Sequence, residues 1–126
     1  MKVLIADDHA LFRDGLTMQL EKIDPKAIIF QASNYLQALK FFENEPNVDL
    51  VILDLDMQDM HWEDGFEKIK NKSNGAKMVV ISASEDAKQM RKALDSGING
   101  YIPKRADTKI LTGALKLIMD GGTYLP

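Results

Sequence analysis

The fold of this 126-residue chain is decided by the stretch VDLVILDLDMQDMHW, residues 48–62. Six of its first eight residues are apolar, and a continuous apolar run is typical of a β-strand buried on both faces of a sheet. The run then opens into three acids within six positions, Asp54, Asp56 and Asp59. A buried strand that ends in carboxylates indicates a site where charged groups are held at a fixed point.

Apolar runs of strand length recur along the chain. They occupy residues 3–6, 27–30, 50–53 and 78–81, with a shorter run at residues 100–102. Segments with apolar residues at helical spacing follow each run, so strand and helix alternate five times. This alternation predicts one α/β domain, a parallel sheet of five strands flanked by five helices on both faces.

Composition excludes several functional classes. Apolar residues make up 45% and charged residues 28%, and the net charge of -3 does not indicate binding to nucleic acid or to an acidic membrane. The chain has no cysteine, which excludes disulfides, thiolate metal sites and cysteine nucleophiles and is typical of a cytoplasmic protein. No stretch approaches the ~20 apolar residues of a membrane span, so no membrane partner is expected.

Polar side chains follow four of the predicted strands. The first strand ends at Asp7 and Asp8, the third at Asp54, the fourth at Ser82 and the fifth at Lys104. Taken singly, an acid or a serine can cap a helix and a lysine can be a solvated charge. Ligands of open parallel sheets bind at the carboxyl ends of the strands, so the five groups together favour a functional site.

The residue types at this edge indicate phosphoryl chemistry on a metal. Two carboxylates about 4 Å apart repel by roughly 4 kcal/mol at an effective dielectric near 20, so three of them require protons or a cation. Oxygen ligands without His or Cys favour Mg²⁺. A carboxylate beside Mg²⁺ can attack a phosphoryl group and form an aspartyl-phosphate. Lys104 would then neutralise charge on that group, and Ser82 would hydrogen-bond one of its oxygens.

Four motifs carry a family resemblance: DDH at 7–9, LDLDM at 53–57, ISAS at 81–84 and GYIPK at 100–104. With them, residues 1–126 resemble the receiver domain of a bacterial two-component response regulator. The resemblance implies a flavodoxin-like (CheY-like) fold with strand order 2-1-3-4-5. It also implies phosphorylation by a sensor histidine kinase, with no enzymatic activity beyond the domain's own phosphorylation and dephosphorylation.

The resemblance also assigns roles to individual residues. Asp54 is expected to be the phosphoacceptor, Lys104 to pair with its carboxylate or phosphate, and Ser82 and Tyr101 to be the switch residues. The implied Mg²⁺ ligands are Asp8 directly, Asp7 largely through water, Asp54, and the backbone carbonyl of Asp56.

The chain departs from the common receiver pattern in one loop and at Arg105, which follows Lys104 where many receivers have proline, and its tail resembles one branch. Gln58 stands where receivers usually carry proline, and the loop between the third strand and the third helix, at residues 58–64, is longer than usual. Pro103 precedes Lys104, an arrangement that resembles the NarL/FixJ (LuxR-type) branch of transcription factors. The segment ALKLIMDGGTYLP at 114–126 resembles the last receiver helix of that branch and the start of its linker, at about 121–126. The tail therefore favours a receiver followed by a helix-turn-helix domain, with DNA binding expected only through that domain, and leaves a free-standing receiver open. The apolar surface of the last helix leaves a homodimer open.

Three alternatives remain open from the sequence. A haloacid-dehalogenase-type phosphatase also uses a DxD, a serine and a lysine, but its DxD normally follows the first strand. A pseudo-receiver would share the fold and act as an unphosphorylated interaction module. His9 and His61 as zinc ligands are the weakest alternative, since His9 is expected to begin the first helix and His61 to lie, with Trp62, in an exposed loop.

Overall fold

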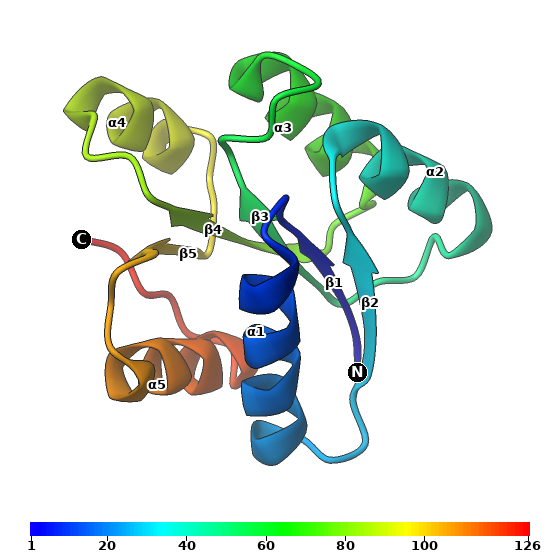
Figure 1. Ribbon diagram of the computed structural model, residues 1–126, viewed down its shortest axis with the longest axis vertical. Coiled ribbons are helices and arrows are strands. Elements are labelled where there is room, and N and C mark those ends of the chain that lie inside the picture. The colour runs from blue at the N-terminus through cyan, green and yellow to red at the C-terminus, as the bar shows by residue number, and fades with distance from the viewer.

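The computed structural model describes residues 1–126, and every predicted element is present (Figure 1). The strands are β1 (Lys2–Ala6), β2 (Ile28–Ala32), β3 (Leu50–Asp54), β4 (Lys77–Ser82) and β5 (Gly100–Pro103). The helices are α1 (Ala10–Ile23), α2 (Tyr35–Asn44), α3 (Trp62–Lys72), α4 (Ala87–Asp95) and α5 (Thr108–Met119).

The five strands form one parallel sheet in the order β2-β1-β3-β4-β5, which confirms the predicted fold class. Helices α1 and α5 cover one face, and α2, α3 and α4 cover the other (Figure 1). Side chains alternate along each strand, so β3 contributes Val51 and Leu53 to one core cluster and Leu50 and Ile52 to the other. This explains the continuous apolar run that opens the decisive stretch.

The edge strand β2 differs from the prediction. The apolar run at 27–30 was expected to be a strand buried on both faces, but the strand begins at Ile28 and extends to Ala32. Ile28 is 52% exposed because β2 pairs only with β1 and is therefore partly open to solvent.

The strand register aligns the polar side chains at one edge of the sheet. Ala6 pairs with Leu53, so Asp7 and Asp54 follow at the same level of the neighbouring strands β1 and β3. Asp54 in turn pairs with Ile81 of β4, one residue before Ser82. Ser82 pairs with Pro103 of β5, one residue before Lys104. Asp7, Asp54, Ser82 and Lys104, one from each of four strands, therefore reach the same edge of the sheet.

The residues after α5 return to the sheet. Tyr124 forms a parallel bridge with Gly100, its carbonyl accepts the Tyr101 N–H at 2.9 Å, and its N–H donates to Asn99 at 3.0 Å. The tail therefore runs along the outer edge of β5. None of the helices combines the length and apolar character that crossing a membrane requires.

One expectation at a helix start was wrong, that for Trp62, whereas His61 is exposed before its helix and His9 stands at the start of α1 as expected. Trp62 is the first residue of α3 rather than part of an exposed loop, and its partly buried ring packs against the core. His61 is the N-cap of that helix, and its Nδ1 accepts the Glu63 N–H at 3.3 Å. His9 lies just before α1, as its N-cap.

Candidate functional site

A lysine and two buried acids form the centre of the site. Lys104 Nζ lies 2.8 Å from Asp7 Oδ2 and 3.3 Å from Asp54 Oδ2. Both acids are only 2% exposed. Since burial of unpaired carboxylates is costly, the lysine is the group that makes this arrangement stable without a metal.

The Asp54 carboxylate is fixed from two sides. Its Oδ1 accepts the backbone N–H of Asp56 at 3.0 Å, while its Oδ2 faces Lys104. Burial raises the pKa of Asp54 above its ordinary value, and the charge of Asp7 adds to this, although the Asp56 N–H and Lys104 act in the opposite direction. The site therefore holds a carboxylate whose negative charge is poorly compensated.

Lys104 is held as a cation by its surroundings. Burial acts to lower its pKa, but the hydrogen bond to Asp7 and the charge of Asp54 outweigh burial and raise the pKa above the ordinary value. The ammonium also lies 4.8 Å from the ring centroid of Phe12 on α1. Lys104 therefore stays charged at neutral pH and provides a fixed positive charge beside Asp54.

The acids have the donor set of a divalent-cation site. Ligand atoms of Asp7, Asp8, His9 and Asp54 all lie within 4.8 Å of one another. Three of these four residues offer the carboxylate oxygens that Mg²⁺ prefers, and Asp8 is open to solvent on its outer side. The residues present therefore fit a magnesium ion at this edge of the sheet.

His9 lies in the acidic site, whereas the sequence predicted it as a helix start and, as the weakest alternative, a zinc ligand paired with His61. Its Nδ1 lies 2.9 Å from Asp8 Oδ1 and 3.0 Å from Lys104 Nζ, and its backbone N–H donates to Asp7 at 2.7 Å. The only signal was its position directly after the two acids. His61 is not in this cluster, so the proposed pairing of the two histidines as zinc ligands is not supported.

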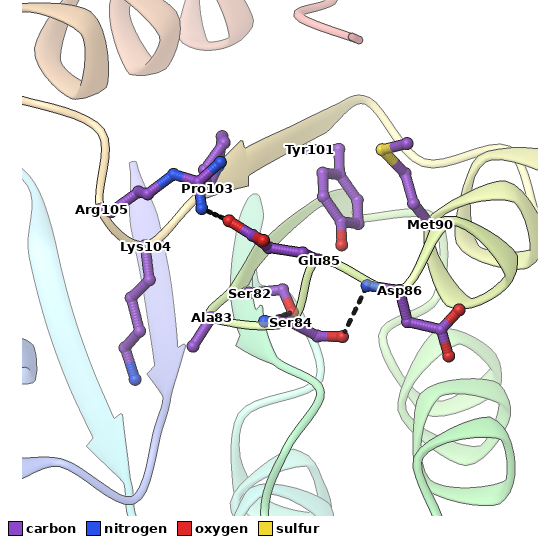
Figure 2. Close-up of a pocket in the computed structure, with 10 residues that line it drawn as sticks. All are labelled: Ser82, Ala83, Ser84, Glu85, Asp86, Met90, Tyr101, Pro103, Lys104 and Arg105. Atoms are coloured by element: carbon purple, nitrogen blue, oxygen red, sulfur yellow. Dashed lines mark hydrogen bonds and ion pairs between the residues drawn. The ribbon is translucent and has the colours of Figure 1, made fainter.

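The predicted switch residues line a pocket between the β4–α4 loop and β5 (Figure 2). Ser82 is 2% exposed, and its Oγ accepts the Ser84 N–H at 3.0 Å. Tyr101 is 4% exposed, and its hydroxyl has no hydrogen-bond partner. Figure 2 shows the Tyr101 ring beside Met90 of α4, whereas Lys104 leads away from it.

The remaining acids of the decisive stretch have separate surroundings. The Asp56 side chain lies 3.4 Å from the amide of Gln89, a nearly buried residue of α4. Asp59 points away from the cluster and accepts the N–H groups of Tyr35 and Leu36 at the start of α2. The three acids therefore do not form one group, and only Asp54 belongs to the metal cluster.

Comparison with known protein families gives a match to the response regulator receiver domain over residues 3–116. The chain belongs to this family. The glycerol metabolism activator of Pseudomonas putida is 31% identical over 125 residues, which cover 99% of this chain and 57% of that protein. The oxygen regulatory protein NreC of Staphylococcus carnosus is 31% identical over 129 residues, covering 99% of this chain and 58% of that protein. This receiver chain thus spans somewhat more than half the length of these relatives.

A solved structure supports the same assignment. A LuxR family DNA-binding response regulator from Silicibacter pomeroyi superposes with a TM-score of 0.85 at 34% identity, covering 100% of this chain and 97% of that one. The chain is therefore a receiver domain of the type found in LuxR-type response regulators. Receivers are signalling domains rather than conventional enzymes, and no comparison favours the haloacid-dehalogenase-type phosphatase or the pseudo-receiver.

The raised pKa of Asp54 predicts a pH-dependent stability. Because the folded-state pKa lies above the ordinary value of 3.8, the folded receiver takes up a proton at higher pH than the unfolded chain does. Below pH 3.8 the Asp54 carboxyl is protonated in both the folded and the unfolded chain, so its contribution to stability is fully present. That contribution is lost as pH rises through the folded-state pKa, because the buried carboxyl then becomes charged. In Mg²⁺-free buffer near neutral pH, Asp54→Asn should therefore unfold with a free energy higher by about 1 kcal/mol. Urea titrations should show this gain shrinking toward about pH 4, and a pH-independent difference would contradict the assignment.

Proposed function

We propose that this receiver takes a phosphoryl group from a sensor histidine kinase onto Asp54 and thereby switches the surface formed by α4, β5 and α5. The observation that carries the proposal is the geometry of one carboxylate. Asp54 is buried, one of its oxygens is held by the Asp56 N–H, and the other faces the Lys104 ammonium at 3.3 Å. A carboxylate so oriented is a rigid nucleophile at the open edge of the sheet.

Mg²⁺ is the proposed cofactor. The carboxylates of Asp7, Asp8 and Asp54 would hold it, with Asp7 acting largely through water and the backbone carbonyl of Asp56 as a further ligand. When bound, the ion would supply positive charge against the oxygens of the transferring phosphoryl group. Asp7 and Asp54 are buried on a rigid sheet, so this charge would be fixed in place.

The transfer follows from the groups around Asp54. An Asp54 oxygen forms a bond to phosphorus while the bond from phosphorus to the kinase imidazole nitrogen breaks, and that nitrogen keeps the electron pair. The Lys104 ammonium then balances charge on the new acyl phosphate, and the Ser82 hydroxyl donates to one of its oxygens. No proton has to leave Asp54, since the reacting form is the carboxylate.

The same residues couple the reaction to the surface. The Ser82 hydroxyl is joined to the β4–α4 loop because its oxygen accepts the Ser84 N–H, so a shift of the hydroxyl toward the phosphate would draw that loop with it. That loop lines the pocket with Tyr101, whose buried hydroxyl has no partner before the switch (Figure 2). Movement of Ser82 and Tyr101 together would change the α4–β5–α5 surface.

The domain that this receiver controls is proposed from the similar proteins. The similar structure from Silicibacter pomeroyi is described as a LuxR family DNA-binding response regulator. We therefore expect this receiver to control a helix-turn-helix DNA-binding domain, with residues 121–126 beginning the linker, in the cytoplasm. Ile110 and Leu117 of α5 are 45% and 46% exposed, and they provide apolar surface for a receiver homodimer.

Labelling with a small phosphodonor tests this function. Purified receiver incubated with acetyl phosphate should gain one phosphoryl group per chain in Mg²⁺ and lose the reaction in EDTA. Intact-mass spectrometry measures the stoichiometry. Labelling that is equally fast without a divalent cation would contradict the magnesium role, and multiple turnover of p-nitrophenyl phosphate would favour the phosphatase.

A further inference from the structure

Tyr35, the first residue of α2, reaches across to the phosphoacceptor loop from the neighbouring helix. Its side chain is 0% exposed, and its hydroxyl donates a 2.7 Å hydrogen bond to the backbone carbonyl of Leu55. Leu55 directly follows Asp54, at the end of β3. A buried aromatic residue that served packing alone would be better as phenylalanine, because a buried hydroxyl is costly unless it is hydrogen-bonded.

The Leu55–Asp56 peptide unit joins this bond to the acceptor. Its carbonyl accepts the Tyr35 hydroxyl, and its N–H, on the far side of the same rigid plane, donates to Asp54 Oδ1 at 3.0 Å. Rotation of the plane would break both bonds at once. The orientation of the Asp54 carboxylate is therefore linked to the position of the Tyr35 hydroxyl.

The surroundings of Tyr35 hold it in this position. A Cβ atom on Gly65 of α3 would lie 2.4 Å from the Cδ1 and Cε1 atoms of the ring, so only glycine allows α3 to pack this closely. Burial first, and then the charges of Asp54, Asp56 and Asp59, raise the pKa of Tyr35 far above its ordinary value. The hydroxyl therefore stays protonated and remains a donor over the physiological pH range.

Asp59 ties the same loop to the same helix. Its Oδ1 accepts the Tyr35 N–H at 3.1 Å, and its Oδ2 accepts the Leu36 N–H at 3.0 Å. A carboxylate on the first N–H groups of a helix is stabilised by the helix dipole. The unusual loop after Asp54, which has Gln58 where receivers usually have proline, is thus anchored to α2 at Leu55 and at Asp59.

We propose that Tyr35 is a positioning residue for phosphoryl transfer, which sets the orientation of Asp54 through the Leu55–Asp56 peptide. This inference rests on the proposed function, because it assigns to Tyr35 a part in the reaction of Asp54. Tyr35 does not touch the reacting atoms. Its effect is exerted through one hydrogen bond to the backbone, so removal of a single oxygen atom tests it.

The experiment compares Tyr35→Phe with Phe42→Leu in the whole chain. Phe42 is a buried residue of the same helix and the same core cluster, so its variant controls for lost stability. Two-dimensional ¹H–¹⁵N NMR of the Mg²⁺-free protein reads the Asp56 amide. Loss of its bond to the carboxylate should move this amide proton upfield in Tyr35→Phe only.

Labelling by acetyl phosphate should become about ten-fold slower in Tyr35→Phe, the range seen when a group that orients a ligand is removed.

The outcomes separate the inference from the proposed function. Tyr35→Phe labelled at the wild-type rate overturns the inference, and so does Phe42→Leu reproducing both the upfield shift and the slower labelling. If the wild-type protein is not labelled at all, the proposed function fails. The amide signal then still decides whether Tyr35 holds Asp54, since it is read without phosphodonor or metal.

Discussion

Asp54→Asn is expected to abolish labelling by acetyl phosphate in Mg²⁺, a loss of at least about a hundred-fold in rate. An amide oxygen carries no negative charge and is a poor nucleophile, while the shape of the side chain is kept. The position is fully buried between Lys104 and the Asp56 N–H, and the other acids are attached to different backbone positions. A neighbouring carboxylate therefore cannot take over the same geometry.

Asp64→Asn provides the matched control for this experiment. Asp64 is an exposed acid in the first turn of α3 and has no contact with the cluster. It should be labelled at the wild-type rate and to the same final stoichiometry. Labelling of Asp54→Asn to one phosphoryl group per chain would place the acceptor elsewhere.

Lys104→Ala is expected to lower both stability and reactivity. Without Mg²⁺, Asp7 and Asp54 lose the cation that lies 2.8 and 3.3 Å from them, and breaking such a buried pair costs about 3 kcal/mol. Added Mg²⁺ should restore much of the stability because it replaces the lost positive charge. Labelling should still be slower by about a hundred-fold, since the fixed charge beside the transferring group is gone.

The neighbouring residue provides the control for the lysine. Arg105 pairs only with Glu85 on the surface, and exposed ion pairs contribute about 0–1 kcal/mol. Arg105→Ala should therefore unfold in urea close to the wild type with and without Mg²⁺. Equal stability of Lys104→Ala and the wild type in EDTA would contradict the role given to Lys104.

The sheet and its polar edge could be predicted because they depend on the local pattern of the sequence. Continuous apolar runs identify buried parallel strands, and parallel strands bring their carboxyl ends to one edge. Asp7, Asp54, Ser82 and Lys104 each follow such a run, so their approach required no knowledge of side-chain conformation. The bounds of β2 differ from the apolar run that predicted it, because an edge strand has fewer pairing and packing constraints.

The hydrogen bonds that hold the site residues in place could not be predicted in the same way. The Tyr35 hydroxyl and the Leu55 carbonyl are 20 residues apart, and nothing in the spacing of either segment indicates that they meet. Asp59 looked like a third member of the acidic group but caps α2, since the chain turns away after Asp56. His9 was interpreted as a helix start or, less favourably, as a zinc ligand with His61, although a residue directly before α1 also lies at the carboxyl edge of β1 beside the acids.

Chemical trapping of the phosphorylated side chain identifies the phosphoacceptor directly. Receiver labelled by acetyl phosphate in Mg²⁺ is reduced with sodium borohydride, which converts an aspartyl-phosphate to homoserine, and its peptides are sequenced by mass spectrometry. If Asp54 is the phosphoacceptor, homoserine appears at position 54 alone and only after labelling. Homoserine at position 7, 8 or 56, or a labelled chain without any homoserine, would contradict this assignment.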